Sequence, residues 1–402
     1  MMAERHRSTV RDLRRDNRSA LLWALFFRQP CTRQELSDAT GLSAASVSTA
    51  VRELISEGIV AEAGPMESDG GRPRVLLRMN PGYGRVIGID VGETRVSAEM
   101  FDLTMARLAR ADHLLNPRKH GVDLVVDRIA SCLDLVWDDA GSEPATLIGV
   151  GIGVPGAIER DRTGQVLVHA QPYGWDAVPL ERLLRDRLGH GLGLLIDNGA
   201  KAMGQAELWF GAERENSTPQ TSRTSRTSRP TVVCLVGSGV GASIVADDRA
   251  VAAEWGHTTI LADGRPCRCG SRGCLEAYVG AEAILERYGL PVPDDDEEAA
   301  LTALVTATSA RADEIREETA VFLGIGIANL INLLNPDRVI IGGWAGLLLA
   351  ERVLPTIREA ARRHSLRNKF SGTTIERGTL GLDAVALGAA TLPIERFFSG
   401  KT

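Results

Sequence analysis

The run Val86-Ile87-Gly88-Ile89-Asp90-Val91-Gly92 has the length and apolarity of a buried β-strand, and it ends in an acidic residue and a glycine. Four further apolar runs, at residues 147–154, 192–196, 231–236 and 339–341, are also followed by turns that contain glycine. The turns that follow them are Pro155-Gly156, Asp197-Asn198-Gly199, Gly237-Ser238-Gly239-Val240-Gly241 and Gly342-Gly343. Helical stretches separate these strands, so the sequence predicts an α/β fold of nucleotide-binding style.

The composition is that of a globular protein whose charge is unevenly distributed. The chain has 402 residues, enough for two or three domains, and 44% of them are hydrophobic. The net charge is −6, yet residues 1–82 carry a net +2, and residues 1–28 contain seven arginines against three acidic residues. A local basic surface matters more for DNA binding than the total charge.

Neither a membrane span nor a secretory leader is expected. No apolar run reaches the roughly 20 residues that cross a bilayer. The Arg-rich first 18 residues also lack the apolar stretch of a signal peptide. We therefore expect a cytoplasmic protein without a membrane partner.

The first 80 residues predict a winged helix-turn-helix. A helix over residues 18–28 is followed by Thr32-Arg33-Gln34-Glu35, a capping-box pattern that opens a second helix ending near Gly41. Ser43 is a candidate cap for a third helix. The buried stripe of that helix is Val47, Val51, Leu54 and Ile55. Two short apolar runs around Asp69-Gly70-Gly71-Arg72-Pro73-Arg74 predict the wing.

The other face of the third helix is small or polar, as a helix lying in the major groove of DNA requires. Wing arginines contact phosphate or enter the minor groove in such domains. The predicted DNA-binding residues are Ser43, Ala44, Ala45, Ser46, Ser48, Thr49, Arg52, Arg72 and Arg74. The alternative is a small helical domain that binds a protein partner.

A cysteine cluster predicts a metal site. Nine residues separate His257 from Cys267-Arg268-Cys269-Gly270-Ser271-Arg272-Gly273-Cys274. One histidine and three cysteines form a closed tetrahedral set that suits a structural Zn²⁺ ion, one per chain. Three free thiols are the alternative. The scattered Cys31, Cys132 and Cys234 are expected to be core residues.

Three other stretches have expected roles of their own. The repeat Thr221 to Arg229 is too polar to pack, so residues 214–230 are predicted to form a disordered surface loop, with a DNA-contacting loop as the alternative. The acidic run Asp294 to Glu298 is predicted to be a solvated loop. The helix from Ala320 to Leu334 is expected to lie in the core instead of an interface.

Together, Glu254-Trp255-Gly256-His257 and the cysteine run ending in Cys274-Leu275-Glu276 resemble the signature of the ROK family, which joins bacterial sugar kinases to sugar-responsive repressors. The chain resembles the repressor branch, which includes xylose and N-acetylglucosamine repressors. The resemblance implies a winged helix followed by a two-lobed, actin-like (ribonuclease H-like) sugar-kinase fold. Its expected parts are residues 1–82 for DNA binding, residues 83–200 for the first lobe, and residues 201–402 for the second lobe, the zinc site and a C-terminal return to the first lobe.

The resemblance also implies that phosphoryl transfer is lost. Kinase members carry Asn-Asp after the third strand, whereas this chain has Asn198-Gly199, and glycine cannot act as a general base. Aligning Asp197 as the base is the alternative, although its side chain is expected to aim elsewhere. Glu93 stands where kinases usually have a glycine in the phosphate-binding turn, and a carboxylate there repels a triphosphate. The candidate vestigial nucleotide-binding residues are Asp90, Gly92, Thr94, Gly237, Gly239, Gly241, Gly342 and Gly343.

The sugar pocket of the family is better preserved. The residues that match sugar-binding positions are Gln171, Asn198, Glu254, His257 and Glu276, with Gln171 where relatives often have Asn. His257 would then bond the sugar through one ring nitrogen and the zinc through the other. The alternative gives Glu254 and Glu276 only a supporting role around the zinc.

These features predict a homodimeric, sugar-responsive repressor that binds a pseudo-palindromic operator in double-stranded DNA. A tetramer is the alternative assembly, and an activator the alternative sign of regulation. Two rival functions remain open. One is an active ATP-dependent sugar kinase with an attached DNA-binding domain, and the other is a regulator with no small-molecule ligand.

Overall fold

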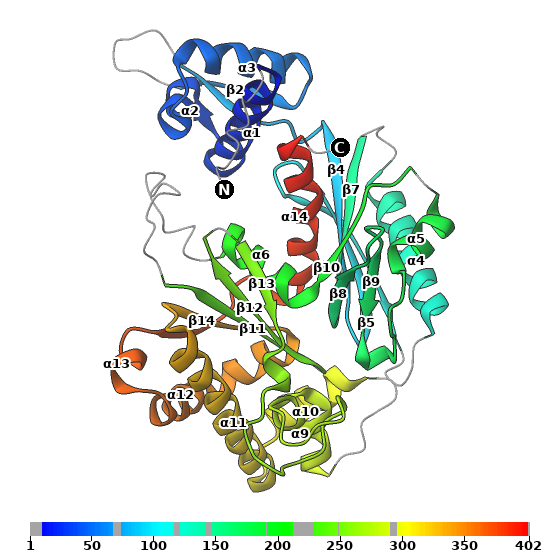
Figure 1. Cartoon of the computed structure of the whole chain (residues 1–402), viewed down its shortest axis with the longest axis vertical. Helices are drawn as coiled ribbons and strands as arrows, with labels where there is room; N and C mark the ends of the chain where they lie inside the picture. The colour runs from blue at the N-terminus through cyan, green and yellow to red at the C-terminus, as the bar shows by residue number, and fades with distance from the viewer. Residues whose placement is uncertain are drawn as a thin grey trace, which may run out of the picture.

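The computed structural model describes residues 10–66, 74–115, 121–141, 146–189, 191–211, 229–247, 249–289 and 296–400. It has a small N-terminal domain above two larger lobes (Figure 1). Each lobe contains a five-stranded sheet. The predicted fold class, a winged helix followed by a two-lobed α/β domain, is confirmed.

The N-terminal domain is the predicted winged helix. Its elements are α1 (Val10–Arg28), β1 (Cys31–Thr32), α2 (Arg33–Thr40), α3 (Ala44–Ser56), β2 (Val60–Met66) and β3 (Arg74–Met79), with strand order β1-β3-β2. Thr32 and Glu35 form the capping box of α2, and Gly41 ends that helix at φ 70°. Ser43 caps α3 by accepting a hydrogen bond from the Ser46 backbone N–H. The wing tip, with Arg72, lies outside the described residues.

The first lobe is a mixed sheet of strand order β10-β7-β4-β5-β6. The strands are β4 (Gly84–Val91), β5 (Arg95–Asp102), β6 (Arg107–Leu114), β7 (Thr146–Val154) and β10 (Leu194–Asn198). Helices α4 (Val122–Asp139) and α5 (Leu180–Leu188), the β8–β9 hairpin (Ala157–Arg160, Val166–His169) and η1 (Gln171–Tyr173) complete it. Strands β10, β7 and β4 are parallel, so their carboxyl ends meet at one edge.

The second lobe repeats this arrangement with strand order β13-β12-β11-β14-β15. Its strands are β11 (Thr231–Val236), β12 (Val240–Ala246), β13 (Arg249–Ala253), β14 (Arg338–Gly342) and β15 (Thr374–Arg377). Its helices are η2 (Trp255–His257), α8 (Glu276–Val279), α9 (Ala281–Tyr288), α10 (Glu297–Thr306), α11 (Ala310–Leu334), α12 (Trp344–His364), α13 (Arg367–Phe370) and η3 (Gly381–Asp383).

Two helices connect the parts of the molecule. Helix α6 (Gly199–Phe210) leaves the first sheet at β10, and the C-terminal helix α14 (Ala384–Ser399) returns to that sheet (Figure 1). Glycines in the sheet allow this close packing, because a Cβ on Gly88 or Gly151 would lie 1.8 Å from a carbonyl oxygen of α14. A Cβ on Gly388 would likewise lie 1.8 Å from the Ala202 carbonyl oxygen of α6.

The predicted solvated loop at Asp294 to Glu298 is wrong for its described part. Asp296 caps α10 through the Ala299 backbone N–H, and Glu297 is only 3% exposed. Glu298 forms an ion pair with Arg95 of the first lobe. The polar composition misled the prediction, because the partners of Glu297 and Glu298 lie 59 and 203 residues away in the sequence.

Helix α11 is a core helix, as expected for residues 320–334. Ala320, Leu323, Ile327 and Ile331 are fully buried in the second lobe. Among the described residues, α11 is the one helix long and apolar enough to cross a bilayer, and half of its most apolar window is buried inside the protein. Most of the Thr221 to Arg229 repeat lies outside the described residues, while Arg229 itself pairs with Asp337.

Candidate functional site

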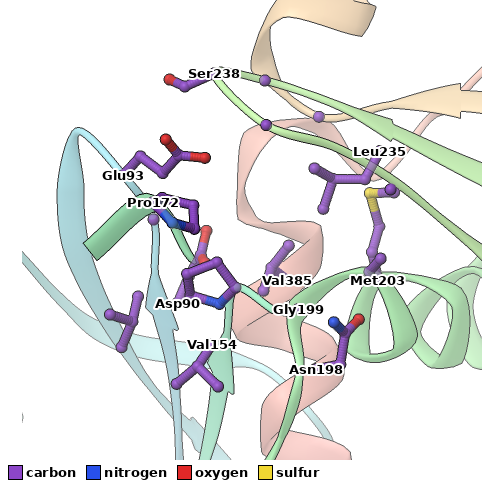
Figure 2. Close-up of a pocket in the computed structure, with 18 of the residues that line it drawn as sticks. Asp90, Glu93, Val154, Pro172, Asn198, Gly199, Met203, Leu235, Ser238 and Val385 are labelled. Atoms are coloured by element: carbon purple, nitrogen blue, oxygen red, sulfur yellow. The ribbon is translucent and has the colours of Figure 1, made fainter. Parts of the chain in front are cut away.

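A cavity of about 430 Å³ lies between the two lobes. Its lining includes the turns after β4 and β11 and the first turns of α6 and α14. The cysteine segment, which is residues 267–274, also contributes. Figure 2 shows Asp90 and Glu93 of the first lobe, Ser238 of the second, Asn198 at the end of β10, and Gly199, Met203 and Val385 from the two connecting helices.

The five residues predicted to bind sugar all line this cavity, namely Gln171, Asn198, Glu254, His257 and Glu276. The Asn198 side chain is held in place, since its amide donates to the Gly156 carbonyl at 2.7 Å and its oxygen accepts from the Lys201 N–H at 3.0 Å. Glu276 is 6% exposed and accepts from the Val240 N–H at 2.9 Å. The cavity therefore presents amide, imidazole and carboxylate groups, which suit a ligand with several hydroxyls.

The position next to Asn198 offers the cavity no functional group. Gly199 begins α6 and lines the cavity wall, where a Cβ would have its nearest neighbours 3.6 Å away. The carboxylate of Asp197 is bound elsewhere, accepting from Lys201 Nζ at 2.5 Å and from the Asn198 N–H at 2.9 Å. A lysine ammonium thus neutralises the one carboxylate adjacent to this turn.

The predicted metal ligands are brought together in space. The ligand atoms of His257, Cys267, Cys269 and Cys274 lie within 4.8 Å of one another and could hold a metal ion. Cys267 Sγ lies 3.7 Å from His257 Nδ1, and Cys269 Sγ lies 3.7 Å from Cys274 Sγ. Gly270 and Gly273 have φ values of 90° and 76°, so the chain can wrap around this point.

Burial favours the protonated thiol at Cys274. It raises the pKa of this thiol to about 12, and the nearby Cys269 and Cys267 add to the shift. A bound divalent cation would have the opposite effect, because a coordinating thiol loses its proton. Metal binding at Cys274 would therefore release a proton.

The predicted nucleotide-facing turns also meet at the cavity. Asp90, Gly92 and Thr94 come from the end of β4 and its turn, and Gly237, Gly239 and Gly241 come from the β11–β12 connection. Gly343 lines the cavity, whereas Gly342 is the last residue of β14 and is not part of the lining. Trp344 occupies the adjacent space, with its indole nitrogen 3.1 Å from the position of a Cβ on Gly237.

The sequence analysis missed the residues that bridge the cavity. Arg268 donates two hydrogen bonds to Glu93, at 2.5 and 2.8 Å, and its Nε donates to Glu276 at 2.8 Å. Arg95 pairs with Glu298, and the Thr94 hydroxyl donates to Glu298 at 3.2 Å. The position of Arg268 between two metal ligands was the available signal, but a single arginine does not reveal its partners.

A buried carboxyl lies behind the β11–β12 turn. Glu297 Oε2 accepts from the Ser238 hydroxyl at 2.5 Å, while Oε1 is buried without a hydrogen-bond partner. Burial raises the pKa of the Glu297 carboxyl to about 7, and the charges of Glu93 and Glu282 raise it further.

The candidate DNA surface is the exposed face of α3. Ser43, Ala44, Ala45, Ser46, Thr49 and Arg52 are exposed, and Ser48 is half-buried. The opposite face buries Val47, Val51 and Leu54, each at most 1% exposed, whereas Ile55 is half-buried. Arg74 is exposed at the start of β3.

Aromatic side chains join this domain to the lobes. The aromatic junction consists of Trp23, Phe26 and Phe27 of α1, Trp209 and Phe210 of α6, and Phe398 of α14. The Trp209 ring centroid lies 5.1 Å from that of Trp23 and 5.6 Å from that of Phe26. Phe398 lies 5.1 Å from Trp23, and Trp209 and Phe398 are 5% and 1% exposed. Such pairs contribute roughly 0.5–1.5 kcal/mol each beyond their burial.

We predict that Glu297→Gln stabilises the protein in a pH-dependent way. The folded chain keeps the Glu297 proton up to about pH 7, whereas the ordinary value for a glutamate is 4.5. The carboxyl therefore costs stability as the pH rises through this window, and the amide removes that cost. The melting temperature of the variant should exceed that of the wild type more at pH 8 than at pH 5. An equal difference at both pH values, or the same trend for the control Glu317→Gln at an exposed position of α11, would contradict this.

Comparison with known proteins supports the assignment of both parts. The ROK family model matches residues 86–396, and a winged helix-turn-helix DNA-binding model matches residues 18–61. A xylose repressor of Caldicellulosiruptor bescii is 29% identical over 96% of this chain and 97% of its own length. The NagC regulator of Escherichia coli is 25% identical over 97% of this chain and 95% of its own.

Kinases and a solved regulator are also similar. A glucokinase of Halalkalibacterium halodurans is 30% identical over 76% of this chain and 94% of its own length. A crystal structure of a ROK family transcriptional regulator, a homologue of the Escherichia coli MLC protein, has a TM-score of 0.75 and 22% identity. It covers 96% of this chain and 97% of its own. The family match over most of the chain shows that this protein belongs to the ROK family.

Proposed function

We propose that this protein is a sugar-responsive, DNA-binding transcriptional repressor of the cytoplasm, and that its kinase-like domain binds a sugar without phosphorylating it. Two relatives of nearly full length are named as a xylose repressor and as the DNA-binding transcriptional regulator NagC. The match of residues 18–61 to a DNA-binding winged helix favours a regulator, and the glucokinase covers only 76% of this chain. We keep residues 1–82, 83–200 and 201–402 as the proposed division of the chain.

One observation carries the proposal: two helices run from the ligand cavity to the DNA-binding domain. The first turns of α6 and α14 line the cavity, at Asn198 to Ala200 and at Ala384 to Ala386. Their far ends carry Trp209 and Phe398 of the aromatic junction. A helix of twelve residues is about 18 Å long and rigid at this length. A ligand that shifts the first turn of α6 therefore moves the support on which α1 rests.

Regulation then follows from linkage. A sugar weakens DNA binding only if it binds more tightly to a lobe arrangement that does not bind DNA than to the arrangement that does. We propose a homodimer, in which two α3 helices read half-sites about one helical turn apart or a multiple of that. A small change in lobe closure then alters the spacing of the two α3 helices.

The metal cluster fits Zn²⁺. A tetrahedral zinc site places two thiolates about 3.8 Å apart, and a thiolate and an imidazole nitrogen about 3.6 Å apart. The observed separations of 3.7 Å and 3.7 Å agree with this geometry. Four protein ligands leave no position for water, which favours a structural ion. With His257 Nδ1 facing the thiolates, Nε2 is the nitrogen left for a sugar hydroxyl.

The proposal excludes efficient phosphoryl transfer. Gly199 has no side chain that could act as a general base. The absence of this base alone lowers the rate of the reaction by about 10² to 10⁴-fold. Asp197 is engaged by Lys201. An active sugar kinase remains the alternative function, and ATP-dependent phosphorylation of a hexose by the purified chain would establish it.

We predict that one sugar releases the protein from its operator. The assay is fluorescence anisotropy of labelled DNA from upstream of its own gene, at fixed salt, with a panel of sugars and sugar phosphates. Arg52→Ala should weaken DNA binding and lower its salt dependence, because fewer phosphates are neutralised. Tight DNA binding that no sugar changes, together with no sugar-induced thermal shift, would favour a regulator without a small-molecule ligand.

We predict that Trp209→Ala uncouples sugar from DNA. The substitution removes the ring that joins α6 to α1, so the sugar should still bind with nearly unchanged affinity. Its effect on DNA affinity should fall from the roughly 5 to 150-fold typical of coupled sites to less than about threefold. Trp209→Phe should retain part of the coupling, and Trp137→Ala, at an exposed position of α4, is the matched control. Full sugar-induced release in the Trp209→Ala variant would remove α6 from the route.

We predict about one zinc per chain by elemental analysis. Cys269→Ser should lose the metal and lower the melting temperature, since binding free energy becomes folding free energy in such sites. Chelation of the wild type should have the same effect and be reversed by added Zn²⁺. Arg272→Ala, at an exposed position of the same loop, is the control. A folded, DNA-binding wild type without metal would contradict the assignment.

A further inference from the structure

An ion pair fills the space between the two glycine turns of the cavity. Glu93 lies in the turn that follows β4 in the first lobe, and Arg268 belongs to the cysteine segment of the second lobe. The Arg268 guanidinium contacts both carboxylate oxygens of Glu93, at 2.5 and 2.8 Å. The Glu93 side chain is 16% exposed and the Arg268 side chain is 28% exposed, so this pair is largely withdrawn from solvent.

The pair lies directly against the backbone of the second turn. A Cβ on Gly239 would be 2.7 Å from Glu93 Oε1 and 2.8 Å from Arg268 Nη2. In turns that cradle phosphate, glycine allows an anionic oxygen to approach the backbone this closely. Here the oxygen beside the Gly239 backbone belongs to the carboxylate of the protein itself.

Arg268 also joins this pair to the sugar-binding candidates. Its Nε donates to Glu276, and its backbone carbonyl accepts from the Gln171 side chain of the first lobe. A triphosphate in this space would have to separate Arg268 from Glu93 and leave an unpaired carboxylate beside its own negative charge. An uncharged sugar at Glu276 and His257 carries no such penalty.

We propose that the Glu93–Arg268 ion pair occupies the place of a nucleotide phosphate between the two turns. Glu93 is then a specificity-determining residue. Through Arg268, Glu93 connects the two lobes although no nucleotide lies between them. The cavity then accepts a single uncharged ligand. The exclusion of nucleotide does not depend on the proposed function, and only the identity of the neutral ligand as a sugar rests on it.

The test compares nucleotide binding by the full-length, zinc-loaded wild type, Glu93→Gly and Glu298→Gln. Equilibrium dialysis with Mg²⁺-ATP gives the dissociation constants. Glu93→Gly should bind Mg²⁺-ATP at least about tenfold more tightly than the wild type. Glu298→Gln is the matched control, because it breaks another interlobe ion pair but leaves the Glu93–Arg268 pair in place. It should bind as weakly as the wild type.

Two results would overturn the proposal. One is no gain in Mg²⁺-ATP affinity in Glu93→Gly over the wild type. The other is an equal gain in Glu298→Gln, which would point to lobe opening instead. Adenosine serves as the ligand without phosphates, and a gain for adenosine equal to that for Mg²⁺-ATP would also contradict a phosphate-specific block. Metal content and circular dichroism confirm that each variant is folded. Failure of the proposed function would appear separately, as wild-type protein that binds no operator or responds to no sugar.

Discussion

The close packing of α14 holds the three parts of this protein together. Its backbone lies against Gly88 and Gly151 of the first sheet, at a distance that leaves no room for a Cβ. Gly388 lets it approach α6 equally closely, and Phe398 carries it into the DNA-binding domain. Because packed interiors do not deform continuously, a displacement at one end of such a helix pair is transmitted to the other end.

The cysteine segment plays the corresponding role at the mouth of the cavity. Its cysteines cluster where they could hold a metal ion, and Arg268, between two of them, reaches across the cleft to Glu93. His257 belongs to this cluster and lines the cavity at the same time. The two-lobed fold of the ROK family is thus combined with a pair of opposite charges that is closed within the protein.

Much of the architecture was predictable because its signals are local. The Thr32–Glu35 capping box, the cap at Ser43 and the stripe of α3 depend on neighbours a few residues apart. The cysteine spacing predicted a cluster that the structure brings together. The acidic run at 294–298 was misjudged, because the burial of Glu297 and the pairing of Glu298 depend on contacts between distant segments.

By itself, the sequence determined the winged helix, the strand-and-turn pattern of the two lobes, the histidine–cysteine cluster and the glycine beside Asn198, because each of these is encoded by residue type and short spacing. Only the tertiary structure decided that Glu93 and Arg268 meet across the cavity, and that Trp209 and Phe398 both reach α1. These contacts join residues far apart in the chain. Their partners are chosen by how the sheets and helices pack, which no local pattern records.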